Sequence, residues 1–97
     1  MNMIGKYVII RADRAGVFAG VLAEKNGDAV VLTDCRLLWQ WDGGASISQL
    51  ALSGPSKPQN CKFTVTLDKI CILGVIEVIP CTELAERVIK EVAVWQR

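Results

Sequence analysis

The stretch that decides the fold most directly is Val17-Phe-Ala-Gly-Val-Leu-Ala-Glu-Lys-Asn-Gly-Asp-Ala-Val-Val-Leu-Thr33. Residues 17–25 alternate with the period of a strand, and residues 29–33 are rich in β-branched side chains. Between them lies Asn26-Gly27, which suits a type I′ turn because both central positions of that turn need positive φ. The stretch therefore predicts a β-hairpin. Gly20, inside the first strand, predicts either a bulge or a close approach by another backbone or a ligand.

Further strands are predicted on both sides of this hairpin. Residues 7–11 are β-branched and aromatic, residues 36–41 continue the hairpin's second strand, and residues 62–68 alternate cleanly. Residues 70–79 are nearly all apolar and predict one or two buried strands broken near Gly74. The alternation over residues 62–68 would turn three side chains inward: Phe63, Val65 and Leu67.

Two helices are predicted. Ser46 is a suitable N-cap for a short helix through Leu52, which Gly54 and Pro55 would end. Thr82 is a suitable N-cap for a helix near the end of the chain. The apolar stripe expected on that last helix consists of Leu84, Val88, Val92 and Trp95.

Together these elements predict an α+β fold in a single domain of residues 1–97. We expect a mainly antiparallel β-sheet, or a small barrel, with a short central helix and a C-terminal helix. The hydrophobic fraction of 52% is high enough for a real core. Because a chain of this size buries a limited core by itself, we also expect a homo-oligomer.

Composition excludes several classes of function. The formal net charge of +1 argues against binding a nucleic-acid polymer, which requires a basic surface. There is no His, and the four cysteines contain no C-x-x-C pair, so neither a metal site nor a cofactor is expected. No signal peptide and no apolar run of about 20 residues is visible, which predicts a cytoplasmic protein that does not enter a membrane. In that compartment the cysteines should be reduced core residues.

No catalytic constellation can be assembled from these residues. Cys81, Ser46 and Ser48 could act as nucleophiles only with a neighbouring base, and the sequence offers no His for that role. The carboxylates are dispersed, and the Gly43-Gly44 pair lacks the rest of a phosphate-binding loop. We therefore expect a binding protein and not an enzyme.

A small anionic ligand with a planar group would suit the region around residues 36–49. Tryptophan faces can stack on a nucleobase, arginine can pair with phosphate in a bidentate manner, and hydroxyl or amide groups can hydrogen-bond to ribose. Other roles are open: the tryptophans as core, Arg36 as a partner of Asp34 or Asp42, and Ser46 as a plain N-cap. The candidate ligand-binding residues are Arg36, Trp39, Trp41, Ser46, Ser48, Gln49, Arg11 and Arg14.

Five segments resemble a family of small phage and prophage proteins without a characterised activity. They are Gly16-Val-Phe-Ala-Gly20, Asn26-Gly27, Arg36-Leu-Leu-Trp-Gln-Trp41, Gly44-Ala-Ser-Ile-Ser-Gln-Leu-Ala51 and Cys61-Lys-Phe63. The resemblance extends over nearly the whole chain to Val94-Trp95, and the segment from Trp-x-Trp to Ser-Gln-Leu-Ala is its most specific part. Gln40 departs from the family, many members of which have an aromatic residue there.

The resemblance implies a phage origin, and phage genes of this size often encode inhibitors of host defence. One group of such inhibitors consists of oligomeric sponges that sequester cyclic nucleotide or ADP-ribose-derived immune signals without cleaving them. An alternative is an inhibitor that binds a host defence protein, in which the tryptophans would be interface anchors. A third is a structural or regulatory phage protein that only self-assembles.

Overall fold

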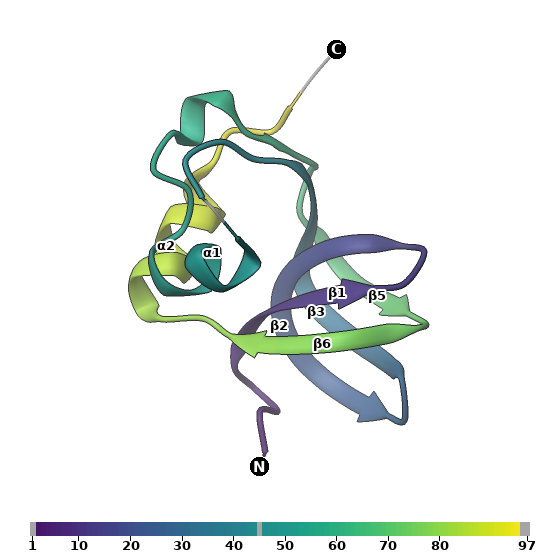
Figure 1. Cartoon of the computed structure of the whole chain (residues 1–97). Coiled ribbons are helices and arrows are strands. Elements are labelled where there is room, and N and C mark those ends of the chain that lie inside the picture. Colours follow the sequence, from purple (N-terminus) through teal and green to yellow (C-terminus); the bar gives the residue numbers. More distant parts are fainter. Residues whose placement is uncertain (1, 45, 96–97) are drawn as a thin grey trace.

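The computed structural model describes residues 2–44 and 46–95 of the chain. Strands and two helices are combined as the sequence predicts, and the α+β fold is confirmed (Figure 1). In chain order the elements are β1 (Tyr7–Ala12), β2 (Gly16–Asn26), β3 (Ala29–Gln40), α1 (Ile47–Ser53), a 3-10 turn (Pro58–Asn60), β4 (Lys62–Phe63), β5 (Leu67–Ile72), β6 (Val75–Pro80) and α2 (Glu83–Glu91).

The strands form one antiparallel sheet that is strongly curled. Its order is β4-β3-β2-β1-β6, and β5 pairs with β3 on the same side as β4. Leu73 and Gly74 alone connect β5 to β6, although these strands pair with different neighbours, β3 and β1. The short connection brings the two edges of the sheet close together at one end (Figure 1). No ladder joins β5 to β6 within the described residues, so the sheet stays open and is not a closed barrel.

Gly20 lies opposite a bulge in β3, and the close approach of another backbone that was predicted for it is present. The register of β2 against β3 shifts between Ala19 and Val21, which leaves Asp34 and Cys35 opposite Gly20. Asp34 takes a positive φ of 50° at this bulge. A Cβ on Gly20 would lie 2.5 Å from the Cβ of Cys35 and 3.0 Å from its Cα, so a side chain would collide with the neighbouring strand.

The hairpin turn differs from the predicted type I′ turn by one residue. Asn26 stays in the ladder opposite Ala29, so the central positions are Gly27 and Asp28. Of these, Gly27 has positive φ (62°), and Asp28 does not, which is the sign pattern of a type II′ turn. The carbonyl oxygen of Asp28 accepts a hydrogen bond from the backbone N–H of Val75 (2.9 Å), and this contact ties the turn to β6.

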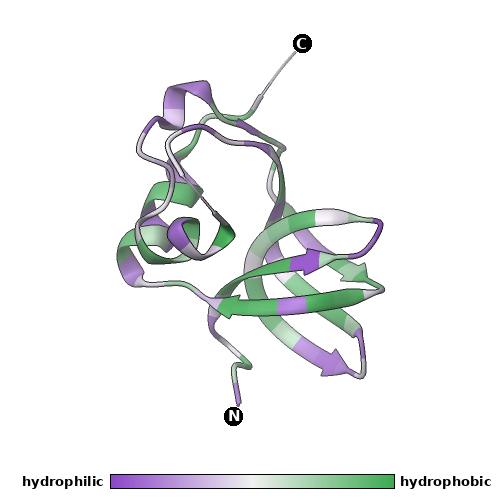
Figure 2. Cartoon of the chain, in the orientation of Figure 1, coloured by the Kyte–Doolittle hydropathy of each residue, from purple (hydrophilic) through white to green (hydrophobic). Residues whose placement is uncertain are grey.

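The two faces of the sheet build two separate cores. The outer core lies between the convex face and both helices. The inner core is made by the concave face, and its buried residues all come from strands. In Figure 2 the strands are mostly hydrophobic, and the turns that join them are mostly hydrophilic. The outer core includes Tyr7, Ile9, Leu38, Leu50, Phe63, Ala85 and Ile89; the inner core includes Val8, Ile10, Phe18, Leu22, Val30, Leu32 and Ile72.

The predicted strand over residues 62–68 is interrupted after Phe63. Phe63 is fully buried as expected, but Val65 and Leu67 are 56% and 46% exposed, so their predicted inward orientation is wrong. Thr64 explains the interruption, because its side-chain oxygen accepts the backbone N–H of Leu37 (2.9 Å) at the point where the ladder with β3 breaks.

Both predicted helix N-caps are confirmed. The hydroxyl oxygens of Ser46 and Thr82 accept the backbone N–H groups of Gln49 (3.2 Å) and Ala85 (3.1 Å). In the apolar stripe predicted for the last helix, Val92 is buried as expected and Val88 is half-buried, but the fully buried positions within α2 lie one residue after the predicted ones. Leu84 is 45% exposed, and the buried positions are Ala85, Ile89 and Val92. No helix in residues 2–44 and 46–95 is long and apolar enough to cross a membrane.

Candidate functional site

The most exposed tryptophan of the described chain belongs to an aromatic pair. Trp39, near the end of β3, is 56% exposed. Its ring centroid lies 4.7 Å from that of Trp95, and the ring planes are tilted by 40°. Centroids this close allow direct aromatic contact. Trp39 therefore presents its rings at the surface against a second indole that supports them.

Three segments distant in the sequence meet at this pair. β4 aligns Lys62 with Gln40 and Phe63 with Leu38. The chain after α2 then passes beside β4, where the backbone N–H of Trp95 donates to the carbonyl oxygen of Phe63 (2.9 Å). The Lys62 ammonium lies 5.4 Å from both indole centroids, within the range of cation–π attraction. We call Trp39, Lys62 and Trp95 the tryptophan platform.

Two of these three residues were not among the predicted ligand-binding residues. Trp95 was expected on the apolar stripe of the last helix, but α2 ends at Glu91 and Trp95 follows it in extended chain. Lys62 has no distinctive sequence context. The sequence held one signal for Trp95. If the last helix ended before Trp95, the chain after it could return to the sheet and bring this indole to the strands.

Arg36 is not available to a ligand, which corrects its predicted role in holding phosphate. The residue is 3% exposed, and its guanidinium donates to the carbonyl oxygens of Thr64 (2.9 Å) and Val92 (2.8 Å), among others. It also does not pair with Asp34 or Asp42, which instead contact Lys90 and Asn60. Burial lowers the pKa of Arg36. Its further carbonyl partners are Ile89, Lys90 and Phe63, so the residue completes the C-terminal end of α2 and fixes it to β4.

The other two predicted arginines lie outside the platform. Arg11, on β1, forms an ion pair with Glu77 of β6 at 2.9 Å. Arg14 lies in the turn between β1 and β2 and lines a cavity at the mouth of the inner core. The structure therefore does not gather Arg11, Arg14 and Arg36 around one phosphate position.

The remaining predicted residues belong to α1 and the segment before it. Trp41 is half-buried against the outer core, so the core role left open for it is the one observed. Ser46 caps α1, and the amide of Gln49 donates to the hydroxyl of Ser53 (2.9 Å). Ser48 is exposed. None of Trp41, Ser46 and Gln49 takes part in the tryptophan platform.

Three of the four cysteines are poor candidates for reactive groups, whereas Cys71 is exposed and does not occupy the core position expected for it. Burial raises the pKa of Cys81 to about 12, and it also raises the pKa values of Cys35 and Cys61, so their thiolates are disfavoured. Within the described residues, no group of three or more Cys, Asp or Glu side chains is arranged to hold a metal ion. The chemistry that the platform offers is noncovalent: stacking against a planar group, with one cation beside it.

Comparison with known proteins adds a family but no activity. The search of curated proteins found no match, and the search of solved structures found none either. Residues 5–89 match the model of a family described as a domain of unknown function, DUF6948. The matched region runs from the residues just before β1 to the last turn of α2, and it includes Trp39 and Lys62. The chain therefore belongs to the DUF6948 family.

Proposed function

We propose that this protein is a phage-encoded binding protein that sequesters a nucleotide-derived immune signal without cleaving it. The observation that carries the proposal is the exposed indole of Trp39, supported by Trp95 and accompanied by the Lys62 ammonium. The phage origin and the counter-defence role rest on the resemblance of the sequence to small phage and prophage proteins.

Stacking is the interaction that the platform supports best. A nucleobase on an exposed aromatic side chain gains roughly 1–3 kcal/mol, and the interaction tolerates different bases. Trp39 offers the accessible indole, and the contact with Trp95 limits the rotation of that indole before a ligand arrives. Little side-chain entropy would then be lost on binding.

Lys62 would supply the charge that Arg36 cannot. Its ammonium lies at equal distance from both indoles, so a phosphate attached to a stacked base would meet it without a large movement of the side chain. A lysine binds phosphate as a point charge and does not impose the bidentate geometry of an arginine. Selectivity among phosphate groups should therefore be modest.

A second copy of the chain would complete this site. The platform is an open surface, whereas small-molecule sites usually enclose most of their ligand. A homo-oligomer that places a second surface over Trp39 would bury both faces of a stacked base. It would also cover exposed apolar side chains such as Val94.

A specific observation favours an alternative, which is inhibition of a host defence protein by direct binding. Large apolar side chains are exposed on several elements beyond the platform, among them Leu52, Leu67, Leu73 and Ile76. Tryptophan is enriched at the energetic centres of protein interfaces. In that case Trp39 would insert into a partner, and Lys62 would lie at the rim of the interface.

Native mass spectrometry with a panel of cyclic nucleotides and cyclic ADP-ribose isomers tests the proposal. We expect an oligomer that retains an intact nucleotide, and weaker retention after Trp39→Ala and after Lys62→Gln. Lys25→Gln, a change of charge at exposed Lys25, which pairs with Val30 at the opposite end of β3 from Trp39, is the matched control. Retention of no panel member would reject sequestration of these signals. Binding of a purified defence protein that Trp39→Ala abolishes would then support the alternative.

A further inference from the structure

A groove opens into the inner core at the end of the molecule where the β1–β2 turn faces β5. It consists of two adjoining cavities of about 500 and 280 Å³, which share Phe18 and Ile70 in their walls. Small-molecule sites in proteins commonly have volumes of about 300–1,000 Å³. The groove therefore has the size of a ligand site, and it is separate from the tryptophan platform.

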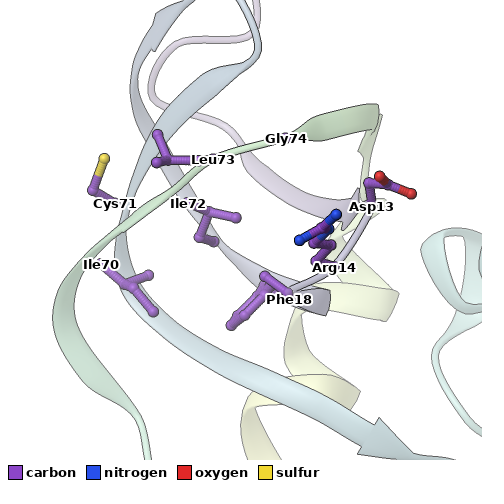
Figure 3. A pocket seen from close by; sticks show the side chains of 9 residues that line it. Asp13, Arg14, Phe18, Ile70, Cys71, Ile72, Leu73 and Gly74 are labelled. Carbon is purple, nitrogen blue, oxygen red and sulfur yellow. The ribbon is translucent and has the colours of Figure 1, made fainter.

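The walls of the groove are predominantly apolar. In the larger cavity the side chains of Phe18, Ile70 and Ile72 point inward from neighbouring strands (Figure 3). The smaller cavity continues this surface with Leu37 and Leu67. The hydroxyl of Thr64, in the wall of the smaller cavity, already accepts the backbone N–H of Leu37 and donates to the carbonyl oxygen of Val65. It is therefore not free to bind a ribose, and a nucleotide is not the expected occupant.

Two arginines line the groove, but Arg36 already donates to backbone carbonyl oxygens, so Arg14 is the cation that a ligand could meet. Figure 3 shows Arg14 reaching toward the cavity beside Phe18, whereas the carboxylate of Asp13 is directed away from it. In the part of the chain that the structure describes, Arg14 forms no ion pair, in contrast to Arg11, which pairs with Glu77 at 2.9 Å. A guanidinium with no acidic partner at the rim of an apolar cavity is suited to receive a carboxylate in bidentate geometry.

We infer that the groove binds an amphipathic monocarboxylate, with its anionic head at Arg14 and its apolar body along Phe18 and Ile70. The body enters the smaller cavity beside Leu67. The inference is independent of nucleotide sequestration, because it uses none of the residues of the tryptophan platform.

Decanoate and decan-1-ol are the probes, because they share the same apolar chain and differ in the charge of the head group. Isothermal titration calorimetry should show that the wild-type protein binds decanoate roughly tenfold more tightly than decan-1-ol, as expected for one charge-assisted hydrogen-bonded contact. Arg14→Gln should remove this preference and leave the affinity for the alcohol unchanged. Arg11→Gln, which removes a neighbouring arginine already paired with Glu77, should retain the preference.

The apolar wall is tested by Leu67→Ser. Leu67 is 46% exposed, so the variant should fold, which circular dichroism checks directly. It should weaken the binding of both probes by the same factor. The inference is overturned if neither probe binds wild-type protein, if Arg14→Gln leaves the preference for decanoate intact, or if Arg11→Gln removes it equally well. Loss of decanoate binding in Trp39→Ala would also overturn it, by placing the ligand at the platform.

Discussion

The convex face of the sheet is covered by helices, whereas the concave face is partly open. On the convex side α1 and α2 cover the outer core, and Arg36 satisfies the backbone carbonyls where α2 meets β4. On the concave side no helix contributes to the inner core, which opens at the groove beside Phe18. On the covered side, hydrogen bonds from a buried arginine accompany the burial of apolar side chains, and both hold the helices on the sheet. Among residues 2–44 and 46–95, Arg36 is the one charged residue that is buried.

This contrast separates residues that hold the fold from residues that are free to bind. Arg36 and Arg14 carry the same side chain, yet one is enclosed by carbonyl oxygens and the other reaches a cavity. Substitutions on the closed side should therefore lower the free energy of unfolding. Substitutions of exposed groove residues such as Arg14 and Leu73 should change ligand binding and leave stability nearly unchanged.

Among the variants that should still fold, Arg36→Met should show the largest loss of stability. The change removes the guanidinium donor from the carbonyl oxygens of Thr64 and Val92, at a cost of about 1–3 kcal/mol for each unsatisfied group. We expect the free energy of unfolding to fall by at least about 3 kcal/mol in urea titrations followed by circular dichroism. The same chemical change at Arg14 is the control, with an expected effect within about 0.5 kcal/mol. Equal losses in the two variants would remove the proposed distinction between the faces.

Gly20→Ala should rank second, because Gly20 lies at the bulge where the backbone of β3 approaches β2 closely. The new Cβ would lie 2.5 Å from the Cβ of Cys35, and both atoms are fixed by strand backbone. Overpacking of this kind costs about 1–3 kcal/mol. Gly27→Ala is the comparison: it has positive φ (62°) and open space around it, so it bears backbone strain without a collision. A smaller loss for Gly20→Ala than for Gly27→Ala in thermal unfolding would contradict the close approach.

Most of the fold was predictable because local patterns agree with the tertiary structure. The hairpin, the break near Gly74 and both helix N-caps follow from turn and cap chemistry that acts within a few residues. The errors concern long-range choices. The alternation of residues 62–68 suggests one strand, but the hydrogen bonds of Thr64 with Leu37 divide it. No local pattern identifies that distant partner.

The site was less predictable than the fold. Trp39 was named as a candidate from the sequence, but its neighbours Lys62 and Trp95 come from segments 23 and 56 residues further along the chain (62 − 39 and 95 − 39). Arg36 was misjudged because arginine is usually exposed, and only the end of α2 explains its burial. The residue types in the sequence indicated stacking on tryptophan, whereas the pairing of β4 with β3 determines that Lys62 lies beside Trp39.

Thr82→Ala tests how firmly the helices close the convex face. Thr82 caps α2 and also donates from its hydroxyl to the carbonyl oxygen of Leu52 in α1, at 2.6 Å. The loss of an N-cap costs about 1 kcal/mol. Because the Leu52 contact is lost as well, Thr82→Ala should destabilise more than Ser46→Ala, whose hydroxyl only caps its own helix. Chemical denaturation compares the two variants, and a larger effect of Ser46→Ala would contradict the linking role of Thr82.

Alkaline pH should weaken the closed side progressively. The pKa of Cys81 is raised from 9.0 to about 12 by burial, and burial also raises the pKa of Tyr7. Above pH 9 the unfolded chain releases the Cys81 proton while the folded chain retains it, so stability is present below pH 9 and is lost between pH 9 and 12. Cys81→Ala should make this decline shallower in urea titrations across the range. An unchanged decline would exclude Cys81 as a contributor.

Leu73→Gln should have the smallest effect on stability. It tests whether the concave face is open at the β5–β6 connection. Leu73 lies in the β5–β6 connection, is 68% exposed and lines the outer end of the groove. An exposed apolar residue contributes little to folding, so the free energy of unfolding should change by less than about 0.5 kcal/mol. Leu50→Gln makes the same change in the outer core, where the side chain is fully buried, and should prevent stable folding. A loss above about 1 kcal/mol for Leu73→Gln would mean that the concave face closes over this residue in solution, because only a buried leucine responds to that extent.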